Sequence, residues 1–209
     1  MADRIGEYDL EVALWKATDD GSPDAVVQAL VDAAEHPERL DDVTPAQALI
    51  TACETLARFD RHDEAIELAR RAVEVGREQE VLDPRTWLAK ILIGAGHSEE
   101  GLAEHRVARR AHPDDWHTYE IVGEAFELAG DPRRAIACFT SGGRRALSRG
   151  ERFDAYRLLG PRWRVRQALG FPRDADDRWA EEVRGRLFPD LRRGPGPAAL
   201  GMSRDGSTG

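Results

Sequence analysis

Apolar side chains recur along this chain at the spacing of amphipathic helices. In residues 6–36, Leu10, Ala13, Val27 and Leu30 fall on such stripes and predict a pair of helices. Near the other end, the apolar positions of residues 174–188 repeat at the same spacing and predict another helix. The pattern favours an all-α protein built from short helices.

Prolines mark where several of these helices begin. Four times, a residue that can cap a helix stands directly before a proline: Ser22-Pro23, Thr44-Pro45, Asp83-Pro84 and Asp131-Pro132. The capping side chain accepts a hydrogen bond from a free backbone N–H, and proline suits the first helical position because it lacks that N–H. Gln47 stands three residues after Thr44, which is the spacing of a capping box.

A repeat of 34 residues runs from Leu82 to Arg149. The second copy reads Tyr119-x-x-Val122-Gly123-x-x-Phe126, then Gly130, then Ala135-x-x-x-Phe139. The first copy reads Arg85-x-x-Leu88-Ala89-x-x-Leu92, then Gly96, Gly101-x-x-x-His105 and a closing Pro113. These residues resemble the tetratricopeptide repeat (TPR), whose signature is W-x2-L-G-x2-Y, A-x3-F and a terminal proline. The resemblance is clearest over residues 82–149 and weaker over residues 46–81.

The resemblance implies a right-handed solenoid of antiparallel helix pairs, each formed by a helix A and a helix B. Three pairs are expected at residues 46–81, 82–115 and 116–149, with B helices that begin near Asp63, Ser98 and Pro132. Divergent helices cap the array at residues 6–36, where helix B begins near Pro23, and at residues 150–192. We expect residues 1–192 to form one domain.

Within the C-terminal cap, Gly160-Pro161 is expected to end a first helix. A second short helix is then expected from Arg162 to Leu169. Residues 193–209 are rich in glycine, proline and serine, a composition that predicts a disordered tail.

Composition narrows the class of protein. The longest apolar stretch, Ile91 to Ala95, is far shorter than a membrane span, and the N-terminus lacks the features of a signal peptide. These features predict a cytoplasmic protein. Arginine supplies 28 of the 30 basic residues, a skew that suggests GC-rich coding DNA and hence a bacterium. Cys53 and Cys138 sit at small or apolar repeat positions, so we expect buried, reduced thiols.

The net charge of −9 is unevenly distributed. Residues 1–140 carry a net charge of −15, whereas residues 141–173 carry +7 because they contain nine arginines. The Arg-rich segment 144–173 also contains aromatic residues, so one interpretation is binding to nucleic acid or to an acidic partner. The other is that these aromatics form the core side of capping helices and that the arginines lie over apolar surface.

Candidate binding residues follow from the family resemblance and from helical geometry. Glu120, Glu124 and Glu127 lie with His117 on one face of the expected helix A, away from the core stripe. Thr86 and Lys90 occupy that face one repeat earlier, and Glu54 occupies it before them. In the family this face lines a concave groove that binds peptides. The resemblance therefore implies an acidic groove for a protein or basic peptide; the alternative is a solvated acidic face.

The basic C-terminal segment supplies a further hypothesis. Through Arg162, Arg164 and Arg166 it is expected either to fold back on the acidic groove or to recruit an acidic partner. We expect an adaptor or regulatory subunit without cofactor or metal. His112 and His117 with Asp114 and Asp115 form a weak metal pattern at a turn between repeats, and no phosphate-binding loop or hydrolase motif is present. An enzyme, such as a hydrolase of a new kind, is the remote alternative.

Overall fold

The computed structural model describes residues 5–76 and 83–187. In these ranges every regular element is helical, apart from one isolated bridge between Ile5 and Leu40. The elements are α1 (Glu7–Asp20), α2 (Asp24–Glu35), a short 3-10 helix (Pro37–Arg39), α3 (Pro45–Arg58), α4 (His62–Val75), α5 (Pro84–Gly94), α6 (Ser98–Ala111), α7 (Trp116–Leu128), α8 (Pro132–Arg149), α9 (Arg152–Ala168) and α10 (Ala175–Leu187). None of them is both long and apolar enough to span a membrane. The predicted tail at 193–209 lies outside the described residues.

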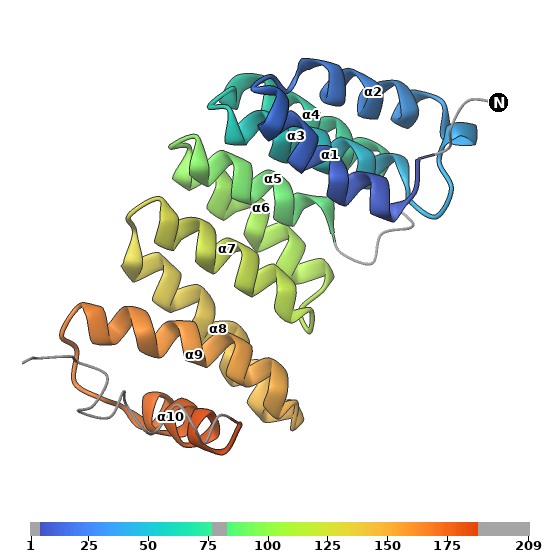
Figure 1. The fold of residues 1–209 in the computed structure, drawn as a ribbon. Helices are drawn as coiled ribbons and strands as arrows, with labels where there is room; N and C mark the ends of the chain where they lie inside the picture. Colours follow the sequence, from blue (N-terminus) through green and yellow to red (C-terminus); the bar gives the residue numbers. More distant parts are fainter. Residues whose placement is uncertain (1–4, 77–82, 188–209) are drawn as a thin grey trace, which may run out of the picture.

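The helices are arranged as pairs stacked from one end of the molecule to the other (Figure 1). Each odd-numbered helix packs against the even-numbered helix that follows it. From α3 onward, each odd-numbered helix also packs against the next odd-numbered one, α3 on α5, α5 on α7 and α7 on α9. The odd-numbered helices therefore form a continuous layer, which we call the A-helix face.

The predicted helix pairs are present in the expected ranges, and most predicted starts are confirmed. The even-numbered helices begin at Asp24, His62, Ser98 and Pro132. Three of the four proline caps have the expected geometry, and Thr44 and Gln47 form the capping box. The fourth is shifted by one residue: Pro23 is itself the N-cap residue of α2, and Ser22 before it accepts at 3.4 Å from the backbone N–H of Asp24.

The core follows the stripe that the repeat motif predicts. Tyr119, Val122 and Phe126 of α7 are buried, as is Phe139 of α8. Burying a side chain of this size contributes roughly 1.5–3 kcal/mol. The Tyr119 hydroxyl donates to the carbonyl oxygen of Pro113 at 3.1 Å, so the closing proline of one repeat is tied to the next. Both cysteines are free and buried, as predicted.

One prediction about the C-terminal cap was wrong, because α9 continues through Pro161 from Arg152 to Ala168. A proline inside a helix removes one backbone hydrogen bond and crowds the carbonyl four residues earlier. Here that carbonyl belongs to Arg157, an exposed residue. Apolar residues on both sides of the proline, Leu158 and Val165, are buried, so packing holds both halves of α9 in one helix.

The close packing of α7 on α8 depends on the absence of a side chain at Gly123. A Cβ atom there would lie 2.5 Å from the Phe139 ring. We expect Gly123→Ala to destabilise the fold by about 1–3 kcal/mol through overpacking. Gly94→Ala is the matched control, because a Cβ at the end of α5 meets nothing within 4 Å. Chemical denaturation should show the control unchanged or stabilised by up to about 1 kcal/mol; equal stability of the two variants would contradict this account.

His105 of α6 occupies the repeat position that Phe139 fills in the next pair. It is 2% exposed, and its Nδ1 atom has no hydrogen-bond partner. Burial, helped by the charges of Arg109 and Arg106, lowers the pKa of His105 from 6.5 to about 4. The folded protein thus holds the neutral imidazole, whereas the unfolded chain binds a proton below pH 6.5.

His105 should therefore make the fold less stable as the pH falls from 6.5 towards 4. At pH 5 the loss amounts to about 2 kcal/mol, given 1.36 kcal/mol per pKa unit. His105→Phe removes this titration and restores the aromatic residue of the motif. Unfolding measurements at pH 7.5 and 5 should show a smaller acid loss for the variant, and a loss equal to that of the parent chain would rule out His105 as the cause.

Candidate binding surface

The acidic stripe of α7 lies on the A-helix face, and two of its three carboxylates are ion-paired. Glu120 is 3.2 Å from the Arg157 guanidinium, and Glu127 is 2.8 Å from that of Arg164. Both arginines belong to α9 and stand 37 residues after their partners. The predicted acidic groove is thus largely neutralised by the next helix of the stack.

Glu124 is the exception in this stripe. Its side chain forms no ion pair with the described residues, and it is exposed. Although the side chain is exposed, neighbouring groups partly exclude water from its carboxyl group, and this desolvation, together with repulsion from Glu120, raises its pKa; Lys90 and Arg164 act in the opposite direction. Glu124 is therefore the one carboxylate of this stripe without an ion pair to the described residues.

Lys90 and Glu54 extend the row of charges across α5 and α3. Lys90 pairs with Glu54, 36 residues earlier, and its ammonium group lies 4.8 Å from the centre of the Trp87 ring. The same arrangement recurs on α7, where the Arg157 guanidinium lies 4.2 Å from the centre of the Trp116 ring. Each cation thus contacts both a carboxylate and an indole, which fixes its position.

His117 lies beside this row and is exposed. Its ring stacks on Trp116 with 3.6 Å between centroids, and its Nδ1 is 3.0 Å from Asp115. Asp115 also caps α7 by accepting from the backbone N–H of His117. His117 is therefore available on the surface, as predicted.

The prediction for Thr86 needs correction, because this residue is fully buried. Its hydroxyl is 3.0 Å from that of Thr118, which stands 32 residues later on α7. Two hydroxyl groups satisfy each other where α5 and α7 meet. Thr86 thus joins neighbouring odd-numbered helices from the inside and cannot contact a partner.

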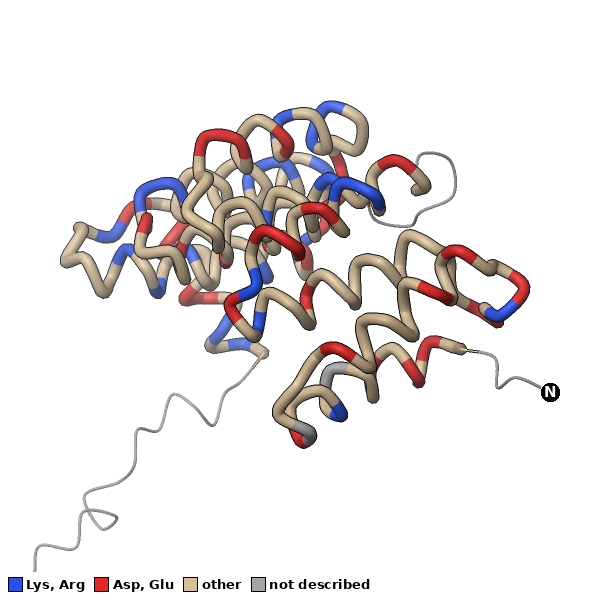
Figure 2. Tube along the Cα trace, turned by 90° about the horizontal axis from the view of Figure 1, so that it is seen from above, with Lys and Arg blue, Asp and Glu red and all other residues tan. Residues whose placement is uncertain are grey.

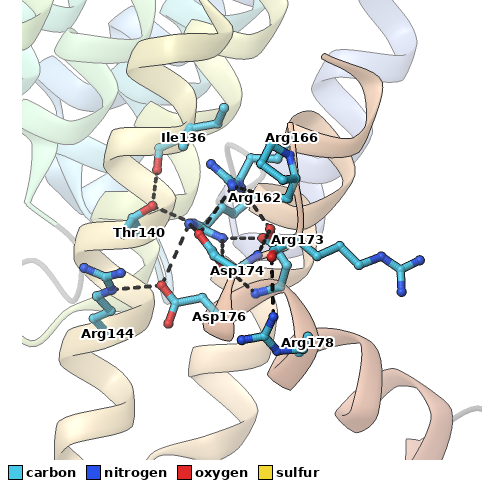
Figure 3. Close-up of polar contacts among 11 residues, drawn as sticks. Ile136, Thr140, Arg144, Arg162, Arg166, Arg173, Asp174, Asp176 and Arg178 are labelled. Carbon is cyan, nitrogen blue, oxygen red and sulfur yellow. Dashed lines mark hydrogen bonds and ion pairs between the residues drawn. The ribbon is translucent and has the colours of Figure 1, made fainter. Parts of the chain in front are cut away.

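Arg162 and Arg166 also differ from the prediction, because they face α10 rather than the groove. The Arg162 side chain is 4% exposed and pairs with Asp174 and with the buried Asp177. Arg166 lies 2.9 Å from Asp177. Figure 3 shows Arg162 between Asp174 on one side and Thr140 of α8 on the other, where its Nε donates at 2.7 Å. This cluster, which we call the α10 network, fastens α10 to α8 and α9.

Of the three arginines named in the fold-back hypothesis, only Arg164 is paired with a carboxylate of the acidic stripe. Arg164 contacts the acidic stripe, but as part of the next helix in the stack and not as a separate lid. Sequence reasoning missed Arg157, although its separation of 37 residues from Glu120 matches that of Arg164 from Glu127. That shared spacing was the available signal that α9 continues the A-helix face.

Most arginines of segment 144–173 form ion pairs with carboxylates of the same chain. Eight of its nine arginines lie within ion-pair distance of a carboxylate: Arg144, Arg145, Arg149, Arg157, Arg162, Arg164, Arg166 and Arg173. The ninth, Arg152, lies over the Trp179 ring. Acidic and basic residues are accordingly interleaved along the chain (Figure 2). The positive charge of this segment is thus largely matched by carboxylates of the same chain.

The residues that suggest chemistry do not form an activated group. Cys138 Sγ lies 3.9 Å from His105 Nε2, but burial raises the pKa of Cys138 to about 12, and the pKa of His105 is lowered to about 4. A catalytic pair needs a thiolate or an effective base near neutral pH, and neither is favoured here. Within residues 5–76 and 83–187, no three His, Cys, Asp or Glu side chains gather in a way that could hold a metal ion.

The α10 network predicts a large cost for removing its buried carboxylate. Asp177→Asn should destabilise the docking of α10 by about 3 kcal/mol, because Arg162 and Arg166 lose a charged partner in a buried site. Glu182→Gln on the same helix is the control, since its pair with Arg186 is exposed and should contribute less than about 1 kcal/mol. Hydrogen exchange of α10 amides measures both; similar exchange in the two variants would show that the network does not hold α10.

Comparison with known proteins adds no family assignment. No protein-family model matches this chain, and no curated protein matches it. The likeness to the tetratricopeptide repeat stays a prediction carried by the 34-residue motif and accompanied by the packing of the helix pairs.

Proposed function

We propose that this chain is a noncovalent binding module for a protein or peptide, built as a TPR-like array that uses its A-helix face. The main support is the continuous layer of α3, α5, α7 and α9, which places side chains from four helices on one surface. A surface of this kind can contact an extended partner at several points.

The chemistry of the A-helix face also suits a protein partner. Trp87 and Trp116 are half-buried, and each lies under a cation that is itself paired with a carboxylate. Tryptophan and arginine are the residue types that most often dominate binding energy at protein interfaces. Glu124 adds a carboxylate without a counterion among the described residues. We infer that the partner brings a basic side chain to Glu124.

Binding is favoured over catalysis by the state of the buried Cys138 and His105, whose pKa values oppose activation. It is favoured over nucleic-acid binding by the eight paired arginines of segment 144–173. Affinity for a phosphate backbone comes from cations that are free to replace counterions.

Photo-crosslinking tests where the partner binds. A photoreactive amino acid at position 124 on α7 should yield adducts with a partner protein in native lysate. The same amino acid at position 74, exposed on the even-numbered helix α4, should yield none. Adducts from position 74 alone would place the site on the other side of the array, and no adducts from either position would count against a protein-binding module.

Charge reversal tests the role of Glu124. Glu124→Lys breaks no ion pair among the described residues, so it should leave the fold intact while lowering affinity for the crosslinked partner about tenfold, or 1.4 kcal/mol. Glu74→Lys gives the same change of charge on α4 and should leave affinity unchanged. Circular dichroism checks folding, and calorimetry or fluorescence anisotropy measures affinity; equal affinities of the two variants would remove Glu124 from the site.

A further inference from the structure

A pocket opens on the surface of α9 beside α10, next to the acidic stripe of α7 but without Glu124 in its lining. Its volume is about 420 Å³, within the range of sites that hold small groups. Tyr156, Pro161, Trp163 and Gln167 of α9 and Arg184 of α10 contribute to its lining. Gly160 also borders the space, and the absence of a side chain there helps to keep it open.

The pocket is positively charged. Arg157 and Arg164 line it together with Arg184, and none of the described residues in its lining is acidic. Arg157 and Arg164 have carboxylate partners on α7. Arg184 has none among the described residues and lies over the Trp163 ring, 5.6 Å from its centre. One positive charge in the pocket is therefore left without a counterion in the described structure.

Trp163 forms part of the pocket lining and lies under Arg184. Its indole Nε1 is buried and has no hydrogen-bond acceptor in the described structure. Because the protein covers that atom, a ligand in the open pocket does not bond to it, and the attraction for an anion comes from Arg184. The indole N–H signal still reports on the pocket, because a ligand that pairs with Arg184 alters the surroundings of this ring.

We propose that this pocket binds an Asp or Glu side chain of an acidic peptide segment. The carboxylate pairs with Arg184 beside the Trp163 ring, while the apolar residue next to it packs on Tyr156 and Pro161. Two of the three arginines that line the pocket are already paired with Glu120 and Glu127. The pocket therefore offers one unpaired cation, which suits one isolated anion better than the successive phosphates of a nucleic-acid strand.

NMR of the full chain tests this site directly. The indole N–H signal of Trp163, identified by its loss in Trp163→Phe, is followed during titration with the peptide acetyl-Gly-Leu-Glu-Leu-Gly-amide. We expect this signal to shift with saturation. The matched peptide with Gln in place of Glu should cause at least a tenfold weaker response. An equal response to the two peptides, or none to either, would overturn the proposal.

Two substitutions on α10 test whether Arg184 supplies the positive charge that binds the peptide. Arg184→Gln should abolish the response to the Glu peptide, whereas Arg186→Gln, an exposed position on the same helix, should leave it unchanged. A response that persists in Arg184→Gln contradicts the assignment. Signals of the other indoles confirm that both variants are folded.

A third arm separates acidic peptide from nucleic acid. A single-stranded oligothymidine should leave the Trp163 signal in place; a shift with the oligonucleotide and none with the Glu peptide would assign the pocket to nucleic acid and overturn the proposal. Glu124→Lys should respond to the Glu peptide like the parent chain, because Glu124 does not line the pocket. The two proposals can therefore be told apart: a result that overturns the role of Glu124 leaves the peptide site untouched, and a result that overturns the peptide site leaves the role of Glu124 untouched.

Discussion

The whole array depends on the close approach of neighbouring helices at points where a side chain is absent. A Cβ atom at Gly101 would lie 2.7 Å from Ile93, and one at Gly142 would lie 2.6 Å from Tyr119. Gly123 faces Phe139 in the same way. These three contacts occur between the two helices of one pair, so they set the distance at which the helices of a pair meet. Interiors packed at this density leave little freedom to adjust.

Because the helix pairs follow one another at a nearly regular interval, residues about one repeat apart in sequence lie next to each other on successive odd-numbered helices. Residues 36 or 37 positions apart become neighbours on the A-helix face, as Glu54 and Lys90 and then Glu120 and Arg157 do. Inside the array a shorter separation, 32 positions, joins Thr86 of α5 and Thr118 of α7. The attraction expected between the acidic first part and the basic segment is therefore expressed as a row of ion pairs between successive helices. It needs no separate segment to fold back.

Local sequence signals predicted most of the fold, because helix starts depend on residues that are close in sequence. Thr44 with Gln47, Asp83 with Pro84 and Asp131 with Pro132 each fix a helix start without tertiary contacts. The prediction that Pro161 ends a helix was wrong because it considered only local propensity, in which a proline costs one backbone hydrogen bond. It took no account of the tertiary packing of the residues on both sides of the proline. Tertiary burial of Leu158 and Val165 decided the outcome.

The candidate site was less predictable, because helical geometry gives the face of a residue but not what covers that face. It correctly placed Glu120, Glu124 and Glu127 together, yet it could not show that α9 brings a cation to two of them. Thr86 lies on the predicted helix but at the line where α7 packs against it. Arg162 is hidden by α10, whose position depends on Asp174 and Asp177 and is not encoded in the spacing of the arginines.

The two kinds of ion pair in this chain differ in how easily they can be exchanged. On the A-helix face, the Arg164 side chain is 64% exposed, and exposed pairs contribute at most about 1 kcal/mol. A partner can therefore replace one member of such a pair at little cost to the fold. In the α10 network, Asp177 is 1% exposed, so the same replacement would leave a buried charge unpaired. A partner can thus replace one member of an ion pair on the A-helix face, while α10 and its residue Arg184 stay in position.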